Sequence, residues 1–200
     1  MSDATIKPPH TPTPRVLTSA EVREVRAAAF QRRELTLDEG GRSFSMRTLM
    51  ATLRSMRAEV RPELEQLAEA AFDAQEPAPD GGLVWSAGQV IDHVYDIQVN
   101  VFGGWVRAAV GLPPTTSMPH TEDHADYPHH TRDACLAMYA TYTTEIEETL
   151  QALGDDPDPG MTSPMESSFI HSLAAALLML CIHEDDHLGQ LRELRALHTA

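Results

Sequence analysis

Two histidines four residues apart stand near the C-terminus, in the stretch His183-Glu184-Asp185-Asp186-His187. In an α-helix, residues at this spacing lie about one turn apart on the same face, so both imidazoles can reach one metal ion. The same spacing occurs in the HExxH motif of zinc peptidases. The pattern therefore predicts a divalent-metal site, and two ordinary hydrogen-bonded helix histidines are the alternative.

The apolar residues of this segment indicate which side faces the protein core. They recur at helical spacing as Leu173, Leu177, Leu180, Leu191 and Leu194. At about 100° per residue, His187 and Glu184 fall inside this stripe, and His183 falls at its edge. Asp185 and Asp186 are expected to point to solvent.

The carboxylate of Glu184 is then an inward-facing charge. An ionised carboxylate is expensive to bury without a partner, and a nearby cation removes that cost. Glu184 is either a general base acting on metal-bound water or an acceptor that orients a ligand histidine. On either interpretation we assign it to the catalytic site.

A tight site needs a third ligand, and His93 is the best candidate. It lies two turns into the helix that begins after Trp85-Ser86, at the edge of an apolar stripe near Val90 and Ile97. Antiparallel packing would place the start of that helix beside the later half of the last one. Three imidazoles leave at least one position open to water or substrate, which is typical of catalytic sites.

A peptidase would take its third ligand downstream of the motif, commonly as HExxHxxGxxH. Here Gln190 stands where the glycine is required, and Glu193 stands where the last histidine is required. If the helix continues, Glu193 lies about 120° away from His187, and His198 lies about three turns further along. This geometry disfavours a peptidase.

Further histidines fall in the polar loop from Gly111 to His130. These loop histidines are His120, His124, His129 and His130. We expect them to be solvated; the alternative is that one reaches the open metal position or binds substrate. Long loops often cover functional sites, so residues 112–130 are expected to cover a pocket at the bundle end. His171 is turned away from His187 and is excluded.

Hydrophobic periodicity and capping signals predict an all-α protein, a four-helix bundle with a short extra N-terminal helix. The four long helices are expected at 45–72, 87–110, 132–153 and 164–197, and the short one at 18–34. Pro62 should kink or divide the first long helix near Arg61. Gly40 and Gly41 are assigned to a loop.

Capping boxes support three of the helix starts: Thr18 with Glu21, Ser86 with Gln89, and Ser163 with Glu166. In the helix at 87–110, the core stripe is expected to be Val90, Val94, Ile97, Val101 and Trp105. Residues 1–17 contain four prolines among polar residues and are interpreted as a flexible N-terminal tail. Residues 18–200 are expected to form one domain.

Composition narrows the possible partners. The chain has 200 residues with 42% hydrophobic content, enough for one core, and a formal net charge of -15. This charge argues against a nucleic-acid partner and against an anionic membrane surface. The N-terminus lacks the apolar run of a signal peptide, and residues 173–182 are too short to span a bilayer. With Cys135 and Cys181 expected as buried thiols, we expect a cytoplasmic protein.

Two fragments together resemble a known family. They run from Trp85 through Ser86, Gly88 and Gln89 to His93, and from His183 through His187 to Gly189-Gln190-Leu191. The pattern W-S-x-G-[EQ] followed by H-x-x-x-H-x-G-Q is similar to that of the DinB/YfiT-like superfamily of metal-binding four-helix bundles. The resemblance covers roughly residues 45–197.

This resemblance implies that His93, His183 and His187 bind a divalent transition metal, with zinc or nickel the usual occupants, in a homodimer. Characterised relatives include transferases and isomerases that use low-molecular-weight thiols. The implied function is a metal-dependent enzyme acting on a small molecule, either a thiol S-transferase or a hydrolase. The alternative is a non-catalytic, metal-stabilised dimeric binding module. The leading helix and the histidine-bearing loop lie outside the common pattern.

Overall fold

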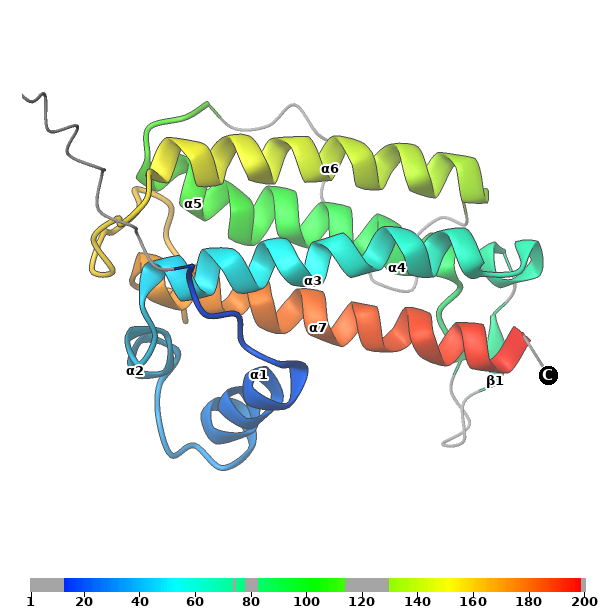
Figure 1. Cartoon of the computed structure of the whole chain (residues 1–200), viewed down its shortest axis with the longest axis horizontal. Helices are drawn as coiled ribbons and strands as arrows, with labels where there is room; N and C mark the ends of the chain where they lie inside the picture. Colours follow the sequence, from blue (N-terminus) through cyan, green and yellow to red (C-terminus); the bar gives the residue numbers. More distant parts are fainter. Residues whose placement is uncertain (1–12, 74, 78–82, 114–129, 199–200) are drawn as a thin grey trace, which may run out of the picture.

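The structure of the chain is a computed structural model, and it describes residues 13–73, 75–77, 83–113 and 130–198. Its main body is a bundle of four long helical rods (Figure 1). The rods are α3 (Met46–Gln66), the continuous series α4 (Ala87–Tyr95), η3 (Asp96–Gly103) and α5 (Gly104–Ala109), then α6 (Arg132–Leu153) and α7 (Leu173–His198). The predicted all-α four-helix bundle is confirmed.

The direction of the rods decides which residues meet. In Figure 1, α3 and α7 run one way along the bundle, whereas the α4–α5 rod and α6 run the other way. The start of α4 therefore lies beside the later half of α7, as the antiparallel arrangement predicted. The end of α5 and the start of α6 lie at opposite ends of the bundle.

The short elements lie outside the four rods. The N-terminal ones are α1 (Ser19–Arg26), the π-helical turn η1 (Ala27–Gln31) and α2 (Leu37–Arg42). They lie on one side of the bundle, and α1 and α2 both contact α7. Between α3 and α4 come the 3-10 turn η2 (Glu69–Phe72) and two antiparallel strands of two residues each, β1 (Glu76–Pro77) and β2 (Leu83–Val84).

Two of the three predicted capping boxes are present. Thr18 with Glu21 caps α1, and Ser86 with Gln89 caps α4. The third, at Ser163, is wrong: the hydroxyl of Ser163 donates to the carbonyl of Trp105 at 2.8 Å instead of capping a helix. The last helix begins at Leu173, after Ser172, whose hydroxyl accepts from the amide of Ala175.

Gly40 and Gly41, which were predicted to lie in a loop, lie inside α2. Thr36 and Glu39 form a capping box that starts this helix. A Cβ at Gly41 would lie 2.4 Å from the carbonyl oxygen of Ala174. These glycines thus allow close approach of α2 to α7.

Pro62 does not divide α3, which continues to Gln66. The π-helical series η3 has a larger effect, because a wider turn shifts which side chains face inward. Within η3, Ile97 and Val101 are only partly buried. The buried positions of η3 are Asp96, Gln98, Val99, Phe102 and Gly103. The predicted stripe is therefore wrong at Ile97 and Val101 and correct at Trp105.

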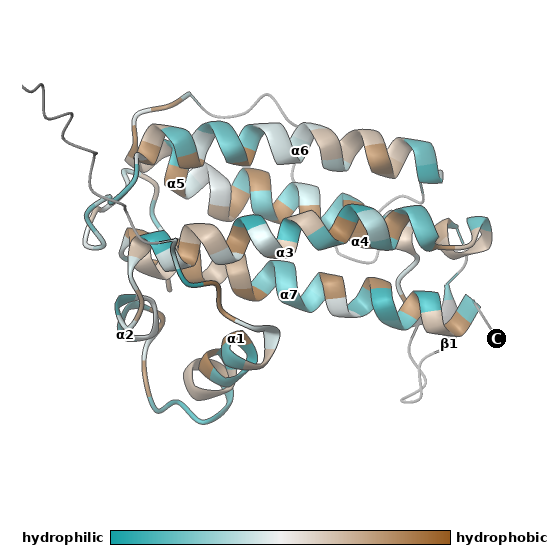
Figure 2. Ribbon diagram, in the orientation of Figure 1, coloured by the Kyte–Doolittle hydropathy of each residue, from teal (hydrophilic) through white to brown (hydrophobic). Residues whose placement is uncertain are grey.

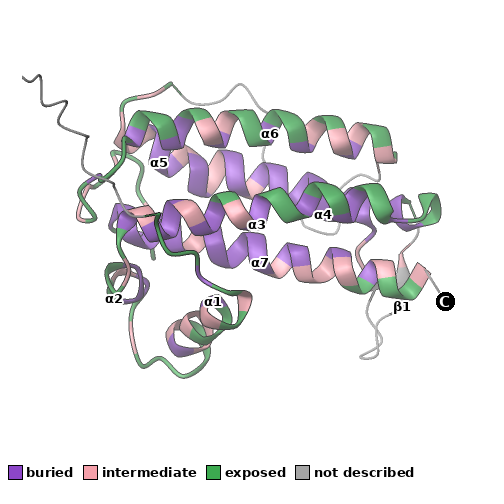
Figure 3. Ribbon diagram, in the orientation of Figure 1, coloured by how far each residue is buried: buried purple, intermediate pink, exposed green. Residues whose placement is uncertain are grey.

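The core is the centre of the bundle, and α7 contributes many buried residues to it. Figure 3 shows α7 buried along most of its first half, and Figure 2 shows hydrophilic residues in its middle. The stretch from His183 to Asp185 of this helix is buried. Leu17, at the end of the expected tail, is buried, and its amide donates to the Thr52 hydroxyl at 2.9 Å. No helix among the described residues is long and apolar enough to cross a membrane.

Candidate metal centre

Three histidines from two rods meet in the bundle. The Nε2 atom of His183 lies 3.1 Å from Nε2 of His93 and 3.1 Å from Nε2 of His187. The ligand atoms of all three residues lie within 4.8 Å of one another. The structure thus brings together the three residues that the sequence predicted. The three residues are only 8% to 9% exposed, so the cluster is largely shielded from solvent.

Local structure explains how His93 reaches α7. Ser86 caps α4 and fixes its first turn, two turns before His93. Gly88, in that first turn, allows close packing: a Cβ there would lie 2.5 Å from the amide nitrogen of His130 and 2.6 Å from the carbonyl oxygen of Phe72. The glycine of the W-S-x-G-[EQ] fragment therefore sets the position of the His93 helix.

The ring of His187 is held by a neighbour one turn away. Its Nδ1 lies 2.7 Å from the amide oxygen of Gln190, so Nδ1–H donates and Nε2 presents its lone pair to the cluster. Burial lowers the pKa of His187 to about 4 and holds the pKa of His183 well below its usual value. At neutral pH both rings are uncharged, which is the form that binds metal.

Aromatic side chains surround the cluster. The ring of Trp85 lies 5.0 Å from the ring of His93, and the ring of Phe102 lies 5.5 Å from that of His183. Phe169 in turn packs edge-on against Phe102 at 6.2 Å. These rings limit the access of water to the histidines.

Glu184 is buried and accepts hydrogen bonds from other helical segments. Its donors are Gln98 at 2.9 Å, Tyr139 at 2.7 Å and Tyr142 at 2.9 Å. Burial raises the pKa of Glu184, while the guanidinium of Arg57 and these three donors oppose the rise. None of the three donors is a candidate metal ligand. The expected catalytic role of Glu184 therefore stays a prediction.

The two acids between the histidines hold the N-terminal helix. Asp185 is 1% exposed and accepts from Nε of Arg23 at 2.8 Å, and Asp186 pairs with Arg26 at 2.9 Å. The expectation that Asp185 points to solvent is wrong. It does face away from the bundle core, but α1 covers that side of α7.

Of the loop histidines, only His130 lies within the described residues; His120, His124 and His129 lie outside them. The Nε2 atom of His130 is 2.7 Å from Oδ1 of the buried Asp92. His130 therefore contacts the residue that precedes His93 rather than the cluster itself. His171 is exposed and does not belong to the histidine cluster, as predicted.

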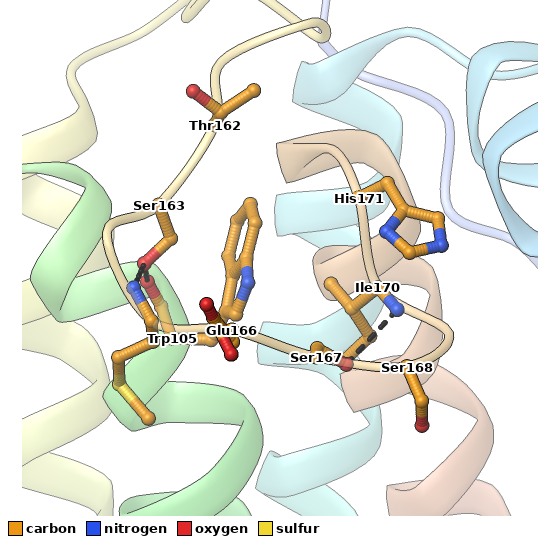
Figure 4. Close-up of a pocket in the computed structure, with 9 residues that line it drawn as sticks. Trp105, Thr162, Ser163, Glu166, Ser167, Ser168, Ile170 and His171 are labelled. Carbon is orange, nitrogen blue, oxygen red and sulfur yellow. Dashed lines mark hydrogen bonds between the residues drawn. The ribbon is translucent and has the colours of Figure 1, made fainter.

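Two cavities lie along the bundle that holds the cluster. One of about 340 Å³ is lined by Trp85 and Gln190, the neighbours of His93 and His187, and by Glu193. A larger one of about 540 Å³ lies beside Trp105 at the end of the bundle where α7 begins, and Figure 4 shows it between Trp105 and the segment up to His171. Neither cavity is lined by any of the three histidines. The predicted cover, residues 112–130, lies mostly outside the described residues.

Sequence reasoning missed several residues of this region. Gln98, Tyr139 and Tyr142 hold Glu184 but come from other segments, so no local pattern marks them. Both cysteines are buried as expected, and burial raises their pKa values, for Cys135 to about 12. Neither thiol belongs to the cluster.

Comparison with known families tests the family assignment. A family model described as the DinB superfamily matches residues 52–191. The matched span includes all three clustered histidines and leaves α1 and α2 outside. No curated protein and no solved structure gave a match.

Proposed function

Because the chain belongs to the DinB superfamily, we propose that it is a metal-dependent enzyme acting on a small molecule. In this proposal His93, His183 and His187 hold one divalent transition-metal ion. The observation that carries it is the convergence of three Nε2 atoms from α4 and α7. Zinc and nickel are the proposed occupants, since imidazole ligands suit both.

The donor set fits such an ion. Two nitrogens bound to one tetrahedral zinc lie about 3.3 Å apart, close to the two 3.1 Å separations between the rings. Three neutral imidazoles leave a fourth position for substrate, as in catalytic rather than structural zinc sites. When bound, the ion would polarise a substrate group or lower the pKa of a thiol or water.

The chain's own residues position the reactants in this proposal. Gln190 keeps Nε2 of His187 directed at the cluster, and Trp85 and Phe102 limit its contact with water. The cavity at Trp85 and Gln190, which are neighbours of His93 and His187, is the proposed entry for a small molecule. We propose a low-molecular-weight thiol as co-substrate, and a homodimer as the assembly.

Metal content is the first test of the ligand set. Elemental analysis of the purified protein should find about one zinc or nickel ion per chain. His93→Ala and His187→Ala should each lose it, whereas His171→Ala, an exposed histidine outside the cluster, should keep it. Stoichiometric metal in either cluster variant would contradict the proposed ligands.

Turnover tests the enzymatic proposal. The metal-loaded protein should consume a low-molecular-weight thiol in the presence of members of a panel of electrophiles, or hydrolyse small esters and amides, and His187→Ala should abolish either activity. If turnover is absent while metal removal lowers the melting temperature sharply, the non-catalytic binding module is the better description.

A further inference from the structure

The smaller cavity near the histidine cluster has an exposed carboxylate in its lining. This cavity, of about 340 Å³, is lined by Val84, Trp85, Val90, Gln190 and Glu193. Among these described residues Glu193 is the one that carries a charge, and it is exposed to solvent. A molecule that enters the cavity therefore meets a carboxylate that it can contact.

The negative charge of Glu193 is not neutralised by the arginines beside it on α7. Arg192 pairs with Glu59 of α3 at 2.5 Å. Arg195 pairs with Glu63 of α3 at 2.6 Å. Within the part of the chain that the structure describes, Glu193 has no ion-pair partner of its own. An uncompensated carboxylate in a cavity wall attracts cations and repels anions.

The rest of the lining indicates an organic cation rather than a metal ion. A hard divalent cation takes several oxygen ligands, and the described lining offers a single carboxylate. Trp85 supplies an indole, the aromatic ring that attracts cations most strongly, and it is only half-buried. Val84 and Val90 add apolar surface. A carboxylate, an indole and apolar walls together suit an ammonium group on a small carbon skeleton.

Two side chains of the lining also contact the candidate metal ligands. The ring of Trp85 lies 5.0 Å from the ring of His93. The amide oxygen of Gln190 lies 2.7 Å from Nδ1 of His187. The cavity is thus one side chain away from the cluster on the side of both ligands.

We propose that this cavity binds the ammonium group of the small molecule on which the metal site acts. The carboxylate of Glu193 pairs with the ammonium, the indole of Trp85 packs against it, and the other end of the molecule extends past Gln190 towards the histidines. This inference rests on the proposed enzymatic function and names the charge of its substrate. The substrates are organic cations, not carboxylates or phosphates.

Choline and its uncharged carbon analogue, dimethylbutanol, test the site. The two molecules have the same shape and the same hydroxyl, so they differ in the positive charge alone. In an NMR titration of the purified protein with zinc added, choline should bind saturably and at least about fivefold more tightly than dimethylbutanol. Equal affinity for the two molecules, or no saturable binding of choline, would refute a cation site.

Reversing the charge of Glu193 locates the bound cation. Glu193→Lys changes an exposed position and should weaken choline binding by about tenfold, because a repulsive charge replaces an attractive one. Glu166→Lys makes the same change at an exposed position in the cavity beside Trp105, and it should bind choline as the wild type does. Unchanged binding by Glu193→Lys would overturn the proposal. An equal loss in both variants would also overturn it, since the overall acidic charge would then explain the binding.

His187→Ala separates this inference from the proposed function. This variant should lose the metal ion and still bind choline, because His187 does not line the cavity. Loss of choline binding in His187→Ala would place choline among the histidines and contradict the cavity site. Metal content and turnover report on the proposed function, whereas choline binding requires neither, so the failure of one is distinguishable from the failure of the other.

Substrate preference tests the link between the cavity and the metal site. Among the small molecules that the metal-loaded protein consumes, those with an ammonium group should show a KM at least about fivefold lower than uncharged molecules of the same size. Glu193→Lys should remove this preference, and Glu166→Lys should keep it. A preference for substrates that carry a carboxylate would contradict the proposal.

Discussion

The amide oxygen of Gln190 lies 2.7 Å from Nδ1 of His187. This single contact fixes which nitrogen of the ring carries the proton, and so which one faces the cluster. Hydrogen bonds of this kind to a ligand histidine typically change metal affinity by about 10-fold to 100-fold.

Gln190→Met keeps the size of the side chain and removes the acceptor. We expect metal affinity to fall by about 10-fold to 100-fold, measured by competition with a chelator of known affinity. Glu193→Gln, an exposed change less than one turn away, is the control and should leave affinity unchanged. Unaltered affinity in Gln190→Met would mean that other contacts orient the ring.

Glu184→Gln tests what the buried carboxylate does. It leaves the guanidinium of Arg57 without its compensating charge, so we expect a loss of about 3–5 kcal/mol in the free energy of unfolding. Tyr142→Phe removes one donor to the carboxylate and should cost about 1–3 kcal/mol. Urea unfolding measures both. If Glu184→Gln abolishes turnover with full stability, the general-base role would be favoured.

The histidine cluster predicts how stability depends on pH in the metal-free protein. Burial lowers the pKa of His187 from 6.5 to about 4, so between these values the unfolded chain binds more protons than the folded one. Stability therefore falls as the pH drops from 6.5 to about 4, by roughly 3 kcal/mol for His187. The urea midpoint of the wild type should fall more steeply across this window than that of His187→Ala. Parallel pH profiles would contradict this origin.

The two glycines of the family fragments should respond differently to substitution by alanine. A Cβ at Gly88 would lie 2.5 Å from the amide nitrogen of His130, so Gly88→Ala should destabilise the fold by about 1–3 kcal/mol and loosen metal binding. At Gly189 the nearest atom would be 3.8 Å away, an ordinary contact. Gly189→Ala should therefore be neutral or stabilising by up to about 1 kcal/mol. Thermal unfolding and chelator competition measure the two effects.

Local signals along the chain were enough to predict the four rods and the histidine cluster. The spacing of His183 and His187 and the cap at Ser86 are local signals, and antiparallel packing then brings His93 to them. The extra residue per turn in η3 has no comparable signal, so the inward face beyond Tyr95 was assigned to Ile97 instead of Gln98.

Contacts made by parts that pack from outside the bundle could not be predicted in this way. A helical wheel places Asp185 away from the core leucines, but it contains no information about a second helix on that side. Ser163 shows the converse: its capping-box pattern is present, yet its hydroxyl contacts Trp105 in another rod. In both cases a partner distant in sequence decides the outcome.

The five residues from His183 to His187 all have assigned contacts. Three face the interior, whereas Asp185 and Asp186 hold α1 through Arg23 and Arg26. If α1 were replaced by a helix without those arginines, the buried carboxylate of Asp185 would lose its ion-pair partner. This carboxylate lies on the helical turn between His183 and His187. The ion pairs thus couple α1 to the turn of α7 that carries the histidines, so a change in either element is expected to affect the other.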